Sequence, residues 1–196
     1  MNKYETKNIY DCDSNGIITS ADVTKLGLHR SKIQNLVRNG EYYQAARGIY
    51  VRSDAWEDEF YILQKKYQCG IFSHATALYL HGYCDRVPLS FHLTFPQGYN
   101  AQSLKKENVI ITRVNKENYE LGVVNLTTPA GNLVKAYDLE RCLCDILRGK
   151  GDDIQIIQTA MKKYAISKEH NINLLMKYAK QLRVEEKVRR YMEVLL

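Results

Sequence analysis

The sequence predicts an α+β protein in which an N-terminal winged helix-turn-helix is followed by a larger mixed α/β domain that ends in helices. Three observations predict this fold. Within residues 1–52, two short helical segments joined by a glycine-containing turn precede a strand–turn–strand segment. Strand-like apolar runs then lie between residues 90 and 137, and amphipathic helical periods follow them. Strands followed by a run of helices are typical of α+β domains.

The composition fits a globular protein of one domain or two small ones. The chain has 196 residues, of which 45% are hydrophobic, and its formal net charge is +6. Its apolar runs are too short to span a membrane, and residues 1–6 lack the apolar core of a signal peptide. The five cysteines include no Cys-x-x-Cys pair, which fits reduced thiols. We therefore expect a cytoplasmic protein, and the basic charge raises nucleic acid as a partner.

The positive charge is concentrated in two regions. Residues 1–52 contain eight basic and five acidic side chains, and residues 177–190 contain six basic and two acidic ones. A strand-like run ends near Ser53, and a new helix is expected to begin at Asp54-Ala55-Trp56-Glu57, with Asp54 as its N-cap. The expected domains are therefore residues 1–52, which bind DNA, and residues 54–196.

The first 52 residues predict the parts of a winged helix-turn-helix. A weak first helix is expected over 2–12, and Thr19-Ser20-Ala21-Asp22 has the pattern of an N-cap that starts a second, short helix ended by Gly27. The recognition helix is expected within 28–39, where Ile33, Leu36 and Val37 form one apolar stripe. Residues 41–51 then predict two short strands about a tight turn, the wing.

The polar face of the recognition helix fits DNA. Arg, Gln and Asn on an exposed helix reach base edges in the major groove, while Ser and Lys reach phosphates. An arginine in the wing can lie along the backbone or enter the minor groove. The alternative is an ordinary solvated helix face, but the short preceding helix, the turn and the wing all favour DNA binding. The expected DNA-binding residues are Ser20, Arg30, Ser31, Lys32, Gln34, Asn35, Arg38 and Arg47.

The remaining residues predict a second module of strands and helices. Helices are expected where Trp56, Phe60, Leu63 and Tyr67 share a face and over 73–82, which Ser73 caps and Gly82 ends. The expected strands are 90–95, 109–111, 123–126 and 133–137, and the expected C-terminal helices carry the apolar stripes 139–147, 154–164, 174–182 and 188–195.

No pattern in the second module indicates catalysis, a metal or a cofactor. His74, His81, Cys84 and His92 lie close in sequence but lack the spacing of zinc ligands, so we expect no metal. Cys142 and Cys144 point to different sides of a helix and are expected to be buried. Asp85, Asp138, Glu140 and Asp145 could be imagined as nuclease carboxylates, yet Asp138 and Glu140 are explained by the first turn of a helix. No phosphate-binding loop or hydrolase motif is present, and we expect no enzyme.

A second basic surface is expected near the C-terminus. Its residues recur at helical spacing, which fits either a solvated helix face or a non-specific phosphate-binding surface. They are Lys177, Lys180, Arg183, Lys187, Arg189 and Arg190.

The order of these features resembles the AbiEi antitoxins, bacterial regulators that are paired with a nucleotidyltransferase-like toxin in abortive phage infection. The resemblance covers nearly the whole chain, and the stretch 73–82 (SHATALYLHG) is its most specific part. The resembling segments are 16–22, 26–39, 47–50, 73–82, 93–96 and 137–145.

The resemblance implies two activities. The winged helix would bind inverted repeats in the promoter of its own operon and repress it. The second domain would counter the toxin without a stable direct complex, as in type IV systems. Two alternatives remain at this stage: a winged-helix regulator without a toxin partner, and a winged-helix-fused nuclease that acts through Asp85 or Asp145.

Overall fold

The structure is a computed structural model that describes residues 9–12, 15–102, 104, 107–148 and 152–195. Its backbone divides into two compact units. The first comprises residues 1–68 together with 127–133, and the second comprises residues 69–126 and 134–196. The functional division into 1–52 and 54–196 stays a prediction, whereas the structural unit that contains the winged helix is larger.

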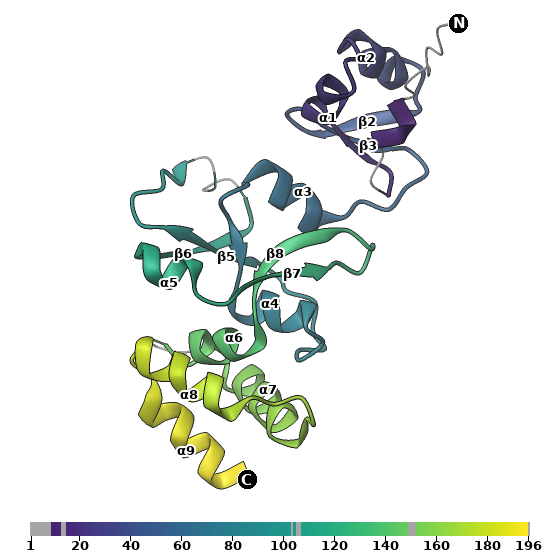
Figure 1. Ribbon diagram of the computed structural model, residues 1–196. Helices are drawn as coiled ribbons and strands as arrows, with labels where there is room; N and C mark the ends of the chain where they lie inside the picture. Colours follow the sequence, from purple (N-terminus) through teal and green to yellow (C-terminus); the bar gives the residue numbers. More distant parts are fainter. Residues whose placement is uncertain (1–8, 13–14, 103, 105–106, 149–151, 196) are drawn as a thin grey trace, which may run out of the picture. The chain divides into compact units, whose positions relative to one another are not determined.

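The first unit is a winged helix-turn-helix followed by one more helix (Figure 1). Its three strands form an antiparallel sheet in the order β1-β3-β2, with Ile18 of β1 and Gln44 of β2 both opposite Tyr50 of β3. The elements are the 3₁₀ helix η1 (Ile9–Cys12), β1 (Ile17–Thr19), α1 (Ser20–Lys25), α2 (Ser31–Arg38), β2 (Tyr42–Ala46), β3 (Ile49–Arg52) and α3 (Glu59–Lys66).

A small apolar core holds the helices against this sheet. Its buried members are Ile9, Ile18, Val23, Ile33 and Tyr42, one each from η1, β1, α1, α2 and β2. Burying an aliphatic side chain of this size contributes about 1.5–3 kcal/mol, so this core is enough to orient the two helices of the motif.

Two expectations for the first unit are wrong in detail. Of the helix expected over 2–12, residues 2–8 lie outside the described residues, and Ile9–Cys12 form a 3₁₀ turn. The helix expected from Asp54 begins instead at Glu59, because the buried Asp58 carboxylate accepts the Tyr61 N–H at 3.1 Å and is the true N-cap. Trp56 therefore precedes the helix and is 89% exposed.

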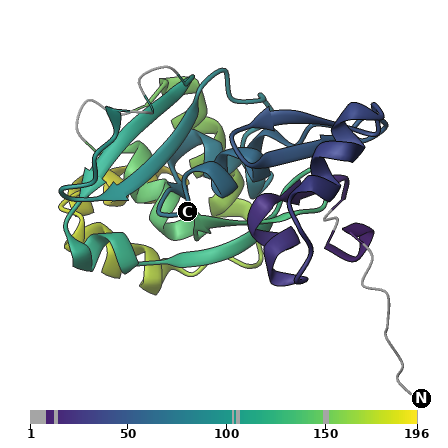
Figure 2. The same cartoon turned by 90° about the horizontal axis from the view of Figure 1, so that it is seen from above.

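The second unit contains a five-stranded mixed sheet in the order β6-β5-β4-β8-β7. Strand β4 pairs antiparallel with β5 and parallel with β8, and β5 pairs parallel with β6. The four C-terminal helices lie on one side of this sheet (Figures 1 and 2). The elements are β4 (Ile71–Phe72), α4 (His74–Leu80), β5 (Phe91–Pro96), β6 (Val109–Val114), α5 (Lys116–Glu120), β7 (Val123–Thr127), β8 (Leu133–Tyr137), α6 (Leu139–Ile146), α7 (Ile154–Ile166), α8 (Ile172–Gln181) and α9 (Glu185–Leu195).

The architecture confirms the predicted α+β class with a winged helix-turn-helix at the N-terminus. The four strands and four C-terminal helices expected in the second module are present, with their ends shifted by a few residues. The sequence patterns missed β4 and α5, which have two and five residues and are too short to show a period.

Candidate nucleic-acid interface

The first helix of the motif begins with a capping box, as its sequence predicts. The Thr19 hydroxyl accepts the Asp22 N–H at 3.1 Å, and the Asp22 carboxylate accepts the Thr19 N–H at 3.2 Å. Gly27 then adopts a φ of +73°, and the N–H of Leu28 donates to the Val23 carbonyl at 3.1 Å. A left-handed residue is needed for this sharp turn, and glycine adopts it without steric cost.

The second helix, α2, starts later than its periodicity suggests. Its first helical residue is Ser31, and Arg30 is the N-cap without a side-chain cap. The ring of His29 supplies the missing acceptor, since its Nδ1 lies 3.3 Å from the Ser31 amide and 2.8 Å from the Ser31 hydroxyl. His29 is thus a residue at the interface that sequence reasoning missed. The signal that could have identified it is its position two residues before the first helical residue, Ser31.

The outward face of α2 is polar along its whole length. Only Ile33 is fully buried, while Leu36 and Val37 are half-buried against the small core. The residues expected to contact DNA all have exposed side chains on or next to this helix. They are Arg30, Ser31, Lys32, Gln34, Asn35 and Arg38.

The turn of the wing lies beside the start of α1. Gly48 has a φ of +74°, and its carbonyl accepts the Ser20 N–H at 2.9 Å. A Cβ on Gly48 would stand 3.4 Å from the Ser20 hydroxyl. The structure therefore brings Ser20 together with the wing turn, where Arg47 is exposed.

Four cations of this unit have no carboxylate partner among the residues that the structure describes. Among the described residues, Arg30, Lys32, Arg38 and Arg47 form no ion pair, and all four are exposed. Arg52, by contrast, is paired with Asp54 at 2.5 Å, and this contact lowers the pKa of the Asp54 carboxyl. The unpaired cations lie at α2 and the wing turn, which are the elements expected to face DNA.

The C-terminal basic residues are distributed over two helices and the turn between them. Lys177 and Lys180 lie on α8, and Arg183 occupies the turn with a φ of +60°. On α9, Lys187 donates to the Leu147 carbonyl at 2.8 Å, and Arg189 pairs with Glu185 at 3.1 Å. Arg190 lies beside a groove between α7 and α9. Lys187 and Arg189 of this set are therefore occupied by contacts within the protein. Contact of the set with phosphate stays a prediction.

The histidines and cysteines considered as metal ligands have structural partners. The rings of His74 and His92 lie 4.7 Å apart, and burial, with the neighbouring His74, lowers the pKa of His92 to about 4. His81 Nε2 lies 2.9 Å from the Tyr137 carbonyl oxygen. In the part of the chain that the structure describes, no three His, Cys, Asp or Glu side chains are grouped as metal ligands would be.

The two helical cysteines are fully buried, as predicted. Cys142 and Cys144 both lie in α6 with no exposed surface, and burial raises the pKa of both thiols. A raised pKa leaves the thiol protonated at neutral pH, which makes it a poor nucleophile and a poor metal ligand.

Three of the four carboxylates considered for a nuclease, those of Asp138, Glu140 and Asp145, are engaged in holding the fold together. Asp138 is the N-cap of α6, accepts the Tyr178 hydroxyl at 3.0 Å, and has a pKa raised mainly by burial. Glu140 accepts the Tyr164 hydroxyl at 3.0 Å, and Asp145 pairs with Arg141 at 3.0 Å with almost no exposed surface. Asp85 is exposed and lies in a loop.

Comparison with known proteins identifies the N-terminal segment. Residues 13–53 match a family described as "Transcriptional regulator, AbiEi antitoxin". The match confirms the resemblance over the segment that forms the winged helix-turn-helix, and it supports the regulator class of protein for this chain.

One solved structure resembles the fold as a whole. The RV2827C protein from Mycobacterium tuberculosis is 16% identical, with a TM-score of 0.54 over 91% of this chain and 75% of its own. At this identity the likeness concerns the fold alone. A search of curated proteins gives no match. Among the described residues, no helix has the length and apolar character required to cross a bilayer.

Proposed function

We propose that the chain is a DNA-binding repressor of its own operon and also the antitoxin of a toxin–antitoxin pair. The observation that carries the first part is the exposed polar face of α2, within a segment that matches the AbiEi regulators. The cations of this face form no ion pair with any described residue. The partner is double-stranded DNA, and inverted repeats in the promoter of the operon are the proposed target.

In this proposal, α2 lies in the major groove. Gln34 and Arg38 are one helical turn apart and share a face, so both can reach base edges at once. Ser31 and Lys32 lie at the start of the helix, where phosphate contacts are favoured by the helix dipole. Arg47 in the wing turn contacts the backbone or the minor groove on the flank.

The test is binding of the purified protein to its own upstream DNA, with a footprint to locate the site. Gln34→Ala or Arg38→Ala should cost about 1–3 kcal/mol at the operator if the side chain reads a base. Lys32→Ala should lower the affinity for all DNA sequences by a similar factor and reduce the salt dependence of binding. Lys168→Ala removes an exposed charge from the second unit and serves as the matched control. Unchanged operator affinity in the Gln34/Arg38 double variant would overturn this assignment.

The C-terminal cations are proposed to add a sequence-independent contribution. Lys177, Lys180 and Arg183 are exposed and have no ion pair among the described residues. Replacing all three by alanine should lower the affinity for random and operator DNA by the same factor. A change in operator preference would contradict this role.

The antitoxin part of the proposal concerns the second unit. In this proposal, the second unit counters a nucleotidyltransferase-like toxin in the cytoplasm. It does so without enzymatic activity and without a stable toxin complex, as in type IV systems of phage defence. Co-expression with the toxin encoded beside it should restore growth, and the Gln34/Arg38 double variant should still restore it. If no neighbouring toxin exists, the chain is a regulator only.

A nuclease acting through Asp145 is disfavoured by the contacts of that residue. Its carboxylate is buried and paired with Arg141, so it has no access to a substrate phosphate. Metal-dependent DNA cleavage that is lost in Asp145→Asn, with the fold intact, would nevertheless establish the enzyme.

A further inference from the structure

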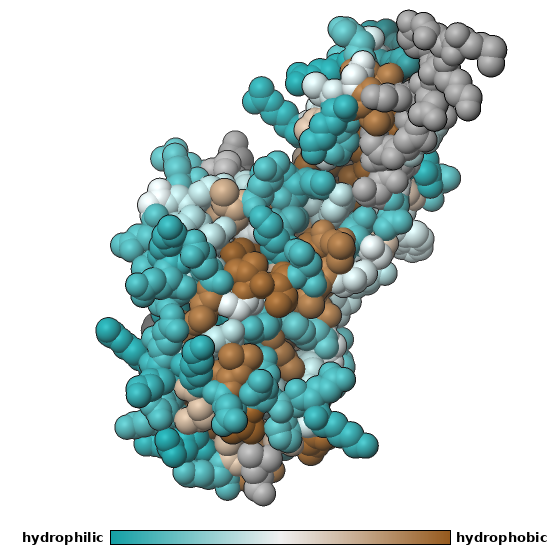
Figure 3. All heavy atoms as spheres, viewed as in Figure 1, coloured by the Kyte–Doolittle hydropathy of each residue, from teal (hydrophilic) through white to brown (hydrophobic). Residues whose placement is uncertain are grey.

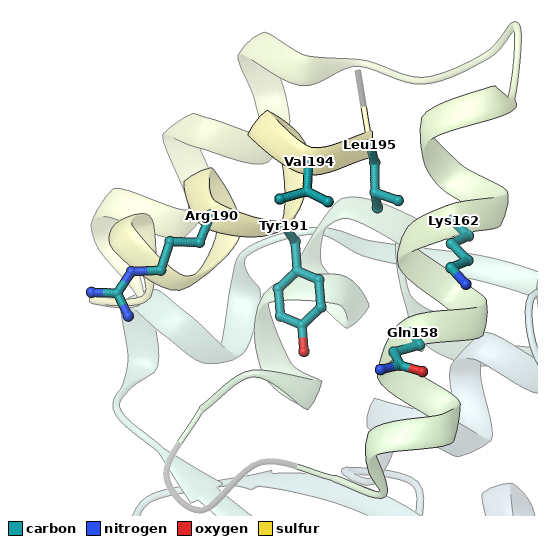
Figure 4. A pocket seen from close by; sticks show the side chains of 6 residues that line it. All are labelled: Gln158, Lys162, Arg190, Tyr191, Val194 and Leu195. Carbon is teal, nitrogen blue, oxygen red and sulfur yellow. The ribbon is translucent and has the colours of Figure 1, made fainter.

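A groove between α7 and α9 is open to solvent and has no role in the proposed DNA contact. Its cavity volume is about 300 Å³, and it is lined by Gln158 and Lys162 of α7 and by Arg190, Tyr191, Val194 and Leu195 of α9 (Figure 4). We call it the α7–α9 groove. Gln158 and Lys162 are one helical turn apart on α7, and Arg190 and Val194 are one turn apart on α9, so each pair lies on one face of its helix.

The polar groups of the α7–α9 groove are mainly hydrogen-bond donors. Among the described residues, Lys162 and Arg190 form no ion pair, and the Tyr191 hydroxyl makes no hydrogen bond. Figure 4 shows the Tyr191 hydroxyl and Lys162 on the two sides of the opening, while the Arg190 guanidinium points outward from its rim. The described residues that line the groove include no Asp or Glu. The charge complement of this lining is therefore a carboxylate.

Apolar side chains continue along the same two helices. Val194 is 83% exposed, and Ile154 and Ile166, which lie at the two ends of α7, are 55% and 83% exposed. On α7, Ile154, Gln158, Lys162 and Ile166 follow one another at intervals of four residues, which places them along one side of the helix. In Figure 3, apolar surface interrupts the polar surface in the part of the second unit that contains these helices. Exposed apolar surface rimmed by charge indicates an interaction site.

We propose that the α7–α9 groove binds a short amphipathic segment of a partner protein that presents apolar side chains next to acidic ones. The volume accommodates one or two side chains, and the strongly exposed Val194 indicates contact with a surface larger than a small ligand. An acidic residue of the segment pairs with Lys162 or with a reoriented Arg190. Helices laid into apolar grooves are a recurrent mode of peptide recognition. The proposal is independent of DNA binding.

The test uses a defined probe and the full-length protein. The probe is an acetylated amphipathic helical peptide of fourteen residues with leucines on one face and glutamates beside them. In amide NMR spectra, it should shift resonances of 154–166 and 185–195 and leave those of α2 unchanged. A peptide with lysine in place of each glutamate should bind at least about tenfold more weakly.

A charge swap provides the matched control. Lys162→Glu combined with Arg190→Glu should reverse the preference between the two peptides, and both replaced side chains are exposed, so the fold should persist. Lys177→Glu on α8 reverses a charge away from the α7–α9 groove and should leave the preference between the two peptides unchanged. Val194→Asp should weaken the acidic peptide further.

Four results would overturn the proposal. They are equal affinity for the acidic and basic peptides, shifts that map elsewhere, the same shifts with octanoate or a DNA duplex at comparable affinity, and concentration-dependent dimerisation that Val194→Asp abolishes. The last two would assign the α7–α9 groove to a small anion or nucleic acid, or to a second copy of the chain. Operator binding is tested separately through Gln34 and Arg38 of α2, so failure here leaves that part of the proposed function standing.

Discussion

Replacing Arg141 by methionine should destabilise the second unit severely. The guanidinium is fully buried, pairs with Asp145 at 3.0 Å and lies 4.1 Å from the centre of the Tyr137 ring. It also donates to the backbone carbonyls of Asn118 and Leu121, at the end of α5. One side chain therefore connects α5, β8 and α6.

The magnitude follows from what the substitution leaves behind. The Asp145 carboxylate would remain buried, with only the half-exposed Arg148 as a counter-ion at 3.6 Å. Breaking one partner of a buried ion pair costs about 3–5 kcal/mol. For a chain of this size, each kcal/mol lowers the melting temperature by about 2–4 °C, so a fall of roughly 6–20 °C is expected.

The assay is urea unfolding followed by the near-ultraviolet signal of the tyrosines, together with hydrogen exchange of the α6 amides. Arg148→Met is the control, because a partly exposed ion pair contributes at most about 1 kcal/mol. Combining Arg141→Met with Asp145→Leu should recover stability, since no buried charge is then left unpaired. A loss below about 1 kcal/mol in Arg141→Met would refute this account of the pair.

Two further changes test the caps and the buried histidine. Thr19→Ala removes the capping box with Asp22 and should cost about 1 kcal/mol in the first unit; unchanged thermal unfolding would count against it. His92 has a folded pKa of about 4, because it is largely buried and lies beside His74. The unfolded chain therefore binds this proton first, and stability should fall as the pH drops from 6.5 to 4, by at most about 3 kcal/mol and by about 2 after allowing for partial exposure. His92→Gln should flatten this part of the profile, and an unaltered slope would show that other groups cause it.

The winged helix could be predicted closely because its signals are local. The Thr19–Asp22 cap, the turn at Gly27 and the wing turn at Gly48 are each determined by residues a few positions apart. The start of α2 was predicted less accurately, because the ring of His29 caps the helix and histidine is not among the residues that favour the N-cap position.

The start of α3 could not be predicted because its cap depends on distant residues. Asp58 is buried, and its carboxylate accepts the Thr128 hydroxyl at 2.5 Å and the Asn132 amide at 2.8 Å. Those partners lie about 70 positions further along the chain, in the loop between β7 and β8. Local pattern favoured Asp54, which remains exposed and pairs with Arg52 instead.

Four of the five strands of the second unit were predicted, one from the alternation of apolar and polar residues over 90–95 and the others from short apolar runs. The order of the strands in the sheet could not be predicted. The two-residue strand β4 lies at the centre, between β5 and β8, and pairs with one antiparallel and with the other parallel. Such an arrangement is decided by contacts between residues far apart in sequence, and no periodicity reports them.

Two segments of the resemblance, 73–82 and 137–145, are joined to each other by a hydrogen bond. His81 of the first segment contacts the carbonyl of Tyr137 in the second, and the Ser73 hydroxyl accepts that of Thr94 on β5. The buried Arg141–Asp145 pair completes the second segment. These contacts give the named residues a structural role in the fold of the second unit. The antitoxin activity that we propose would then depend on exposed residues outside these contacts. Exposed features such as the α7–α9 groove are the places to test first.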